Sequence, residues 1–135
     1  MKYLLDTNIC IYLIKRKPIE VFNRFQSHRI HEVAISVVTY FELQYGIEKS
    51  KFRIKSENAL RNFIKNLNVI VLDVDASAKA ASVRAHLEMK GTPIGAYDLL
   101  IAGTALARNM VLVTNNTNEF ERVPGLTMEN WITSP

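Results

Sequence analysis

Three acidic side chains are placed where they can share a metal ion. Asp6 directly follows the apolar run 3–5, and Glu42 lies nearly two turns into the helix expected after the run 33–35. Asp98 lies near the start of a helix that is apolar almost all round. Carboxylates gathered in one pocket repel one another unless a cation or a proton lies between them. Oxygen ligands select hard ions, so the pattern predicts a Mg²⁺ or Mn²⁺ site.

Basic stretches supply a surface for a polyanionic substrate. The chain carries 17 Lys and Arg against 13 Asp and Glu, and this excess is compatible with a nucleic-acid partner. A Mg²⁺ ion binds a phosphate oxygen, activates a bound water and orients in-line attack. Together these features predict phosphoryl chemistry on a polyanion. The basic residues form two groups: Lys15, Arg16 and Lys17; and Lys49, Lys51, Arg53, Lys55, Arg61 and Lys65.

Each of these residues also has a purely structural interpretation. Asp6 can cap the helix that follows it, and Asp98 can be an acidic residue in a first helical turn. Glu42 can lie solvated at the edge of the apolar stripe Val38, Phe41 and Tyr45, and basic clusters are often solvated helix faces. A bare charge buried at Asp98 is costly, so a cation or a proton should lie beside it. The joint placement of the three acids favours a metal site.

Short apolar runs alternating with helical stretches position these residues. The runs are continuous, which is typical of parallel strands buried on both faces. Ligands of such sheets bind beyond the carboxyl ends of the strands, where Asp6, Ser36 and the segment 114–119 lie. We expect strands at 3–5, 33–35, 69–72, 111–113 and a short fifth at 126–128. Helices are expected at 8–17, 18–27, 36–50, 51–66, 76–90 and 95–108. The helix at 51–66 is expected to be basic and amphipathic, with these apolar members: Phe52, Ala59, Leu60, Phe63, Ile64 and Leu67.

Length and composition bound the class of protein. The 135 residues, 48% of them hydrophobic, fit one globular domain over residues 1–135. A lone cysteine, Cys10, cannot form an internal disulfide, so we expect a reducing compartment. No apolar run approaches the roughly 20 residues of a membrane span, so a soluble, cytoplasmic protein is expected. The histidines lie outside the acidic segments, which disfavours zinc, and are expected at the surface: His28, His31 and His86.

Five motifs in order along the chain carry a resemblance to a known family. Residues 4–8, 40–46 and 93–102, each containing one of the three acids, resemble the signatures of PIN-domain ribonucleases. The segments 113–120 and 129–131 narrow the resemblance to the VapC toxins of bacterial VapBC toxin–antitoxin pairs. The similarity extends over essentially the whole chain.

The resemblance implies both a fold and an activity. The fold is a three-layer α/β/α PIN domain with a central, mostly parallel sheet of four to five strands. The activity is that of a Mg²⁺- or Mn²⁺-dependent endoribonuclease toxin of a type II toxin–antitoxin system, in which Asp6, Glu42 and Asp98 hold the metal. The resemblance also implies a homodimer and a cognate VapB antitoxin that covers the site. Operator DNA is contacted only through that antitoxin.

The fourth acidic position departs from the pattern of many PIN domains. Those proteins carry an aspartate after the fourth strand, where this chain has Asn116, and Glu119 is expected to substitute as a catalytic carboxylate. One negative charge fewer leaves open whether one or two metal ions bind. The residues expected to orient carboxylates, water or substrate are Thr7, Asn8, Thr114, Asn115 and Asn116.

The resemblance also indicates a substrate. VapC toxins with Thr-Asn-Asn-Thr at 114–117 and Pro-Ile-Gly at 93–95 resemble enzymes that cut tRNA, among them initiator tRNA in the anticodon stem-loop. The expected RNA contacts are Lys49, Lys51, Arg53 and Lys55.

Two other functions remain open at this level. The first is an RNA-binding translation inhibitor that does not cut RNA. The second is a small-molecule phosphohydrolase on a similar sheet. It is disfavoured because the chain has no Gly-rich phosphate loop, and Asp6-Thr7-Asn8 lacks the second aspartate of an Asp-x-Asp nucleophile motif.

Overall fold

A parallel sheet forms the centre of the fold. The structure is a computed structural model that describes residues 2–132, and it contains a five-stranded sheet with the order β3-β2-β1-β4-β5. Every neighbouring pair of strands is parallel, which confirms the expectation from the continuous apolar runs. The strands are β1 (Tyr3–Leu5), β2 (Val33–Ser36), β3 (Asn68–Ile70), β4 (Val111–Val113) and β5 (Met128–Glu129).

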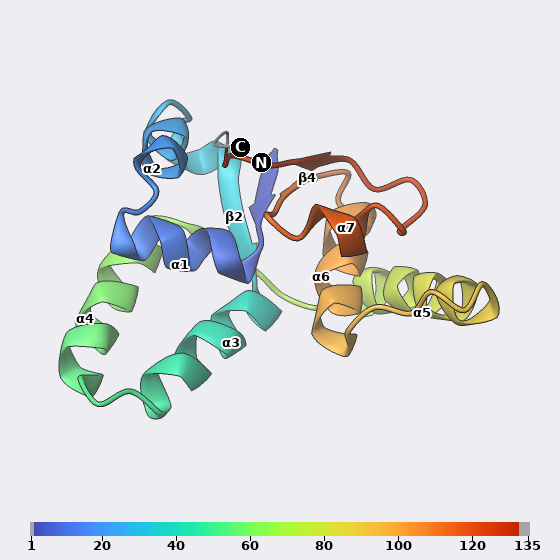
Figure 1. The fold of residues 1–135 in the computed structure, drawn as a ribbon, viewed down its shortest axis with the longest axis horizontal. Coiled ribbons are helices and arrows are strands. Elements are labelled where there is room, and N and C mark those ends of the chain that lie inside the picture. The colour runs from blue at the N-terminus through green and yellow to red at the C-terminus, as the bar shows by residue number, and fades with distance from the viewer. Residues whose placement is uncertain (1, 133–135) are drawn as a thin grey trace.

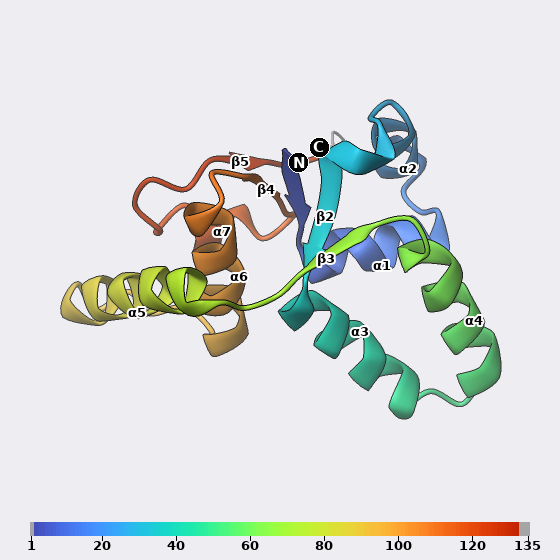
Figure 2. The same ribbon diagram turned by 180° about the vertical axis from the view of Figure 1, so that it is seen from behind.

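Helices cover both faces of the sheet and make it the middle of three layers (Figures 1 and 2). A short 3₁₀ turn, η1 (Ile30–Glu32), precedes β2. On one face lie α1 (Thr7–Lys15), α2 (Ile19–Gln26), α3 (Val37–Glu48) and α4 (Arg53–Ile64). On the other lie α5 (Val74–Met89), α6 (Ala96–Ala107) and α7 (Thr117–Phe120). The three-layer α/β/α fold is therefore confirmed.

The alternating direction of strand side chains explains the two cores. In β1, Leu4 packs with α5–α7, whereas Tyr3 and Leu5 pack with α1–α4. Adjacent residues of a strand point to opposite faces, so a strand covered on both sides must be apolar throughout. Helix α6 is packed between the sheet and α5, and its Ile101, Ala102 and Ala105 are fully buried.

Several boundaries differ from those expected. The third strand is Asn68–Ile70 rather than 69–72, because the chain leaves the sheet after Ile70 and Val71 is 61% exposed. The fifth strand is Met128–Glu129 rather than 126–128. Residues 117–120 form the short helix α7. This turn was not expected, because four residues are too few to show a helical repeat.

Three side-chain placements were wrong in the sequence interpretation. Phe52 was expected in the apolar face of the helix at 51–66, but it precedes α4 and is 72% exposed. The stripe beside Glu42 is mostly exposed, because Phe41 and Tyr45 face outward. His28 is not a simple surface residue, since its ring packs between those of Tyr3 and Trp131 and its Nε2 is buried. The exposure of each of these side chains depends on contacts between segments that are distant in the sequence.

The limits of the described chain bear on two further expectations. Among residues 2–132, no helix combines the length and the apolar character needed to cross a membrane. A single domain over residues 1–135 stays a prediction, because residue 1 and residues 133–135 lie outside the described chain.

Candidate active site

Asp6 is the buried centre of the site. It follows β1 and caps α1, where its Oδ1 accepts a hydrogen bond of 2.8 Å from the Thr7 backbone N–H. Its Oδ2 accepts a hydrogen bond of 2.7 Å from the hydroxyl of Thr114, which follows β4 next to β1. The structural and functional interpretations of Asp6 are therefore compatible, because one oxygen caps the helix while the carboxylate faces its acidic neighbours.

Glu42 is held by a threonine pair. The Thr7 hydroxyl donates a hydrogen bond of 2.7 Å to Glu42 Oε1, and Thr7 Oγ1 lies 3.2 Å from Thr39 Oγ1. The N-cap Ser36 sets the start of α3, because its hydroxyl accepts from the Thr39 N–H at 3.0 Å. Helical spacing then places Thr39 and Glu42 on one face toward α1. Sequence reasoning missed Thr39, although its three-residue spacing from Glu42 was a usable signal.

Asp98 and Glu119 form a pair across α6 and α7. Their side chains are hydrogen-bonded to each other, and the Asn116 side-chain amide donates a further bond of 2.7 Å to Glu119. The Asn116 backbone N–H donates to Thr114 Oγ1 at 2.9 Å, which links the turn after β4 to the Asp6 side of the site. The structure thus brings Glu119 next to the three acids, with Asn116 as its support.

The electrostatics of the site show an excess of negative charge. Burial raises the pKa of Asp6, the hydrogen bonds from Thr114 and Thr7 lower it, and the charges of Glu42 and Glu119 raise it again. The pKa of Asp98 is raised to about 8, first by burial and then by the hydrogen bond with Glu119 and the charges of Asp6, Glu119 and Glu42. The pKa of Glu119 is lowered, first by the hydrogen bond from Asp98. Asp98 therefore holds the proton that the pair shares.

This shared proton makes stability depend on pH. We expect the unfolding temperature of the metal-free protein to fall as the pH rises from about 4 to about 8. Over this range the folded Asp98 keeps a proton that the unfolded side chain, with its ordinary pKa of 3.8, has lost. The raised pKa of Asp6 acts in the same direction. Thermal unfolding in EDTA at several pH values measures the slope. Asp98→Asn should flatten it, and an equally steep slope in that variant would contradict the assignment.

The donor set has the oxygen chemistry that hard divalent cations prefer. Its members are carboxylate oxygens, and the charges that act on Asp6 and Asp98 are those of other acids. Among residues 2–132, no three acidic, histidine or cysteine side chains stand close enough together to enclose a metal ion by themselves. Mg²⁺ commonly keeps several waters and uses one or two carboxylates with substrate phosphates, so a complete protein cage is not required.

Three asparagines form the outer edge of the site. The Asn115 N–H lies 3.5 Å from Asn8 Oδ1, and the Asn115 side-chain amide donates to the Tyr12 hydroxyl at 3.4 Å. Asn130 donates to Asn115 Oδ1 at 3.2 Å. The sequence interpretation included Asn8 and Asn115 but missed Tyr12 and Asn130. Their contacts join segments more than a dozen residues apart, and no local pattern indicates them.

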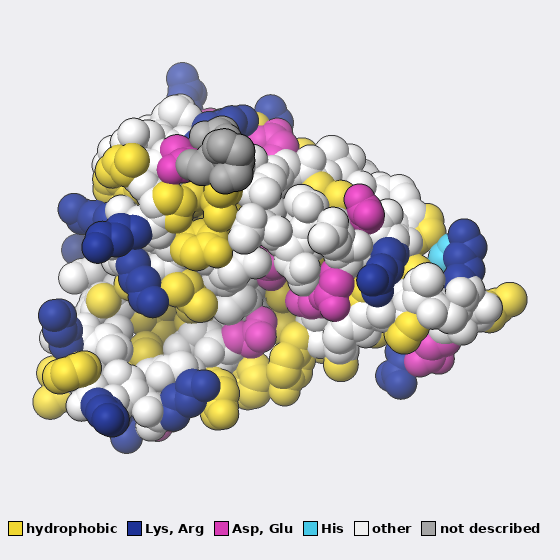
Figure 3. All heavy atoms as spheres, in the orientation of Figure 1, with side chains coloured by type: hydrophobic (Ala, Val, Ile, Leu, Met, Phe, Trp, Pro, Cys, Tyr) yellow, Lys and Arg dark blue, Asp and Glu magenta, His cyan; other side chains and the backbone are white. Residues whose placement is uncertain are grey.

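The expected basic contacts lie at the far end of α3, away from the carboxylates. Lys49 packs over the Tyr45 ring at 4.7 Å, and Arg53 forms an ion pair of 2.7 Å with Glu48. Lys51 and Lys55 are exposed in the same region. In Figure 3, Lys and Arg side chains gather over the α1–α4 side, while Asp and Glu side chains group near the middle of the face. A polyanionic strand bound across the acidic cluster can therefore extend onto the basic residues of the α1–α4 side.

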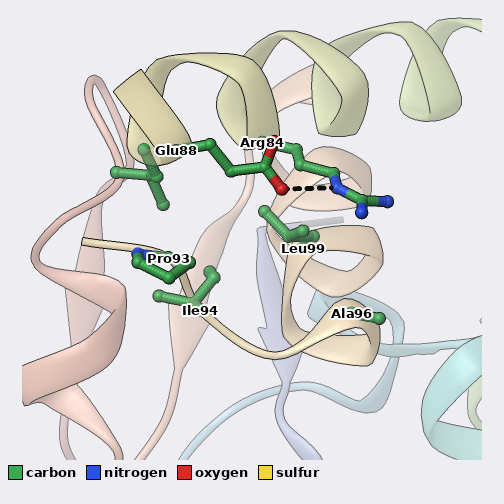
Figure 4. A pocket seen from close by; sticks show the side chains of 7 residues that line it. Arg84, Glu88, Pro93, Ile94, Ala96 and Leu99 are labelled. Atoms are coloured by element: carbon green, nitrogen blue, oxygen red, sulfur yellow. Dashed lines mark hydrogen bonds and ion pairs between the residues drawn. The ribbon is translucent and has the colours of Figure 1, made fainter. Parts of the chain in front are cut away.

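A small pocket lies apart from the acidic cluster (Figure 4). It lies between α5 and the segment that leads into α6, and the ion pair of Arg84 with Glu88 spans one side of it at 3.0 Å. Its volume of about 130 Å³ is well below the roughly 300 Å³ of a typical ligand pocket. The chemistry is therefore better placed at the strand ends.

A parallel sheet between two helical layers, with acids gathered at its carboxyl edge, is the arrangement of a PIN domain. A family model with the description "PIN domain" matches residues 3–126. The tRNA(fMet)-specific endonuclease VapC of Shigella flexneri is 43% identical over 131 residues, which cover 97% of this chain and 98% of that protein.

Solved structures agree with this relationship. The DNA-bound VapBC of Salmonella typhimurium has a chain with a TM-score of 0.92 and 43% identity, covering 98% of this chain and 99% of that one. VapBC2 of Rickettsia felis, bound to a DNA fragment from its promoter, has a TM-score of 0.90 and 40% identity, with coverages of 98% and 100%. The chain belongs to the PIN-domain family, and within it to the VapC ribonucleases.

Proposed function

We propose that this protein is a Mg²⁺- or Mn²⁺-dependent endoribonuclease and the toxin of a type II toxin–antitoxin pair. The observation that carries the proposal is the convergence of four acids at the carboxyl edge of the sheet: Asp6, Glu42, Asp98 and Glu119. The charges of their acidic neighbours contribute to the raised pKa values of Asp6 and Asp98. The relatives named ribonucleases or endonucleases support the same activity.

Different residues of the site have different proposed roles. Asp6, Asp98 and Glu42 would hold the ion, which would supply Lewis acidity toward a phosphodiester oxygen and activate water. Thr114 and Thr7 fix the rotamers of Asp6 and Glu42 through their hydrogen bonds. Glu119, whose pKa is lowered while Asp98 keeps the shared proton, is a carboxylate that would accept a proton from a water attacking the phosphodiester.

The proposed substrate is tRNA, with cleavage in the anticodon stem-loop of initiator tRNA as the specific candidate. Support comes from the relative named for tRNA(fMet), which is similar over nearly its whole length, and from the Thr114–Thr117 and Pro93–Gly95 motifs. An unpaired loop suits an open site at a sheet edge, because its backbone can reach carboxylates that a duplex would keep at a distance.

The proposed partners are a VapB antitoxin, a second copy of the chain in a homodimer, and operator DNA contacted only through the antitoxin. The DNA-bound VapBC structures support an antitoxin partner and its contact with DNA.

A cavity of about 830 Å³ lies between α1, α3 and α4. Its floor is apolar and includes Ile11 and Ile47, and its edge carries Lys15, Lys17 and Lys55. This groove fits an amphipathic antitoxin segment with acidic flanks. Action on tRNA places the protein in the cytoplasm.

The decisive experiment uses purified protein freed of antitoxin and mixed with total tRNA. Discrete cleavage in Mg²⁺ or Mn²⁺ that disappears in EDTA would support the proposal, and sequencing of the new ends would identify the tRNA and the cut site. Retention of cleavage in EDTA would contradict the metal dependence. Ribosomal and messenger RNA in parallel reactions show whether tRNA is preferred.

The same experiment separates cleavage from simple RNA binding. A non-cleaving inhibitor would leave all RNA intact and would still block translation in an extract that contains chelator. Folded, antitoxin-free protein with that behaviour would overturn the nuclease proposal in favour of the RNA-binding inhibitor.

The basic flank is expected to affect binding more than chemistry. Combined substitution of Lys49, Lys51 and Lys55 by glutamine should raise KM for tRNA about tenfold and leave kcat nearly unchanged, because these residues lie away from the carboxylates. The dependence of log Kd on log salt should weaken by about two, given a slope of roughly 0.7 per contacted phosphate of a single strand. The control is Lys79→Gln in α5 combined with Lys90→Gln at the C-cap of that helix. Equal losses in both variants would indicate a general charge effect.

A further inference from the structure

The segment 129–131 is not used by the proposed reaction, yet it is tied firmly into the fold. The Glu129 carbonyl accepts a hydrogen bond of 3.0 Å from the Thr114 N–H. The Glu129 carboxylate accepts from Trp131 Nε1 and from Arg24, each at 3.1 Å. The Trp131 ring is only 1% exposed and stacks on His28. The backbone on both sides of Asn130 is therefore anchored.

Asn130 uses this anchored position to hold another side chain. Its Nδ2 donates to Asn115 Oδ1 at 3.2 Å, and its own Oδ1 accepts from the Ile132 N–H at 3.0 Å. The second bond orients the Asn130 amide, so its N–H group points at Asn115. On the other side, the Asn115 amide donates to the Tyr12 hydroxyl of α1. Asn115 is thus fixed between the end of the chain and the first helix.

The turn that contains Asn115 also carries two supports of the acidic site. The residue before it is Thr114, whose hydroxyl donates to Asp6. The residue after it is Asn116, whose amide donates to Glu119. A rotation of the backbone at Asn115 would therefore move both hydrogen bonds at once.

We infer that Asn130 is a positioning residue for the active site: through its hydrogen bond to Asn115 it holds the 114–116 turn so that Thr114 and Asn116 stay aligned on Asp6 and Glu119. The role in catalysis rests on the proposed nuclease function. The alignment itself is a property of the folded chain and can be measured without RNA. The Asn130 side chain is exposed, so its removal strands no buried polar group and should leave the fold intact.

The test is Asn130→Ala. Removal of a supporting partner commonly costs about 10–100-fold in activity, and the lower end is expected here because Asn130 acts through Asn115. We expect kcat for RNA cleavage to fall about tenfold with KM within about twofold. In the metal-free protein, NMR should show amide hydrogen exchange at Asn115 and Asn116 accelerated about tenfold, with the unfolding temperature within about 3 °C of the parent. The matched control is Asn118→Ala, an exposed asparagine in α7 that should change none of these quantities.

A double-mutant cycle with Asn115→Ala tests the path of the effect. If Asn130 acts through Asn115, the double variant should lose no more kcat than Asn115→Ala alone. Additive losses, or unchanged exchange at Asn115 and Asn116 in Asn130→Ala, would overturn the inference. Accelerated exchange with an unchanged kcat would also overturn it. If the parent protein cleaves no RNA, the nuclease proposal fails, and the exchange measurements alone decide whether Asn130 holds the turn.

Discussion

Asp6→Asn is expected to lower the rate of RNA cleavage by about a thousandfold while the protein stays folded. Asp6 is only 4% exposed and faces Glu42 and Glu119, so its charge lies at the centre of the proposed cation site. Lewis-acid stabilisation of the transition state is worth several kcal/mol, and each 1.4 kcal/mol corresponds to about a factor of ten. Single-turnover cleavage of tRNA in Mg²⁺ measures the loss.

The substitution preserves the local hydrogen bonds. The asparagine oxygen still accepts from the Thr7 N–H, and the new amide can donate to the Thr114 hydroxyl after that hydroxyl rotates. Circular dichroism and the unfolding temperature should therefore stay close to those of the parent. Asp75→Asn, an exposed carboxylate in the first turn of α5, is the matched control and should cleave normally. Parental cleavage by Asp6→Asn would remove Asp6 from the catalytic centre.

Gly103→Ala is expected to destabilise the protein more than a typical substitution. Gly103 lies where α6 crosses α5, and a Cβ there would be 2.5 Å from the Ala76 carbonyl oxygen and 2.9 Å from the Ala80 backbone N. Backbone atoms in a packed helix pair cannot move aside cheaply, so overpacking should cost about 2–3 kcal/mol. Calorimetry should show the unfolding temperature lowered by about 6–12 °C.

Gly46→Ala is the same substitution at another helix position, and it is not expected to destabilise the protein. Gly46 lies inside α3, and a Cβ there would meet no heavy atom within 4 Å. Alanine favours a helix interior over glycine by up to about 1 kcal/mol, so this variant should be as stable as the parent or slightly more stable. Equal destabilisation at both positions would show that the helix crossing at Gly103 is not the cause.

Much of the fold could be predicted because it follows from local physical chemistry. The continuous apolar runs at β1, β2 and β4 predicted buried parallel strands, and their order with the helices predicted two covering layers. The position of Asp6 at the end of a strand indicated which edge carries the site. The apolar surroundings of Asp98 indicated a partner proton or cation, and in the structure burial and the hydrogen bond with Glu119 raise the pKa of Asp98 to about 8.

Other features could not be predicted, because they depend on which surfaces meet. Phe52 and Tyr45 are exposed and His28 is enclosed, although local patterns favoured the reverse. The basic residues near Lys51 follow Glu42 closely in the sequence but lie near the other end of α3.

The sequence by itself determined the class of fold, the edge of the sheet where acidic residues gather, and which acids lie there, because strand periodicity, helix capping and charge burial act over a few neighbouring residues. Only the tertiary structure decided how those acids are supported. Thr39 reaches Thr7 from another helix, and Asn130 reaches Asn115 from the segment that follows β5. Hydrogen bonds of this kind join residues that only the packed chain brings within about 3 Å, and no local pattern records such a distance.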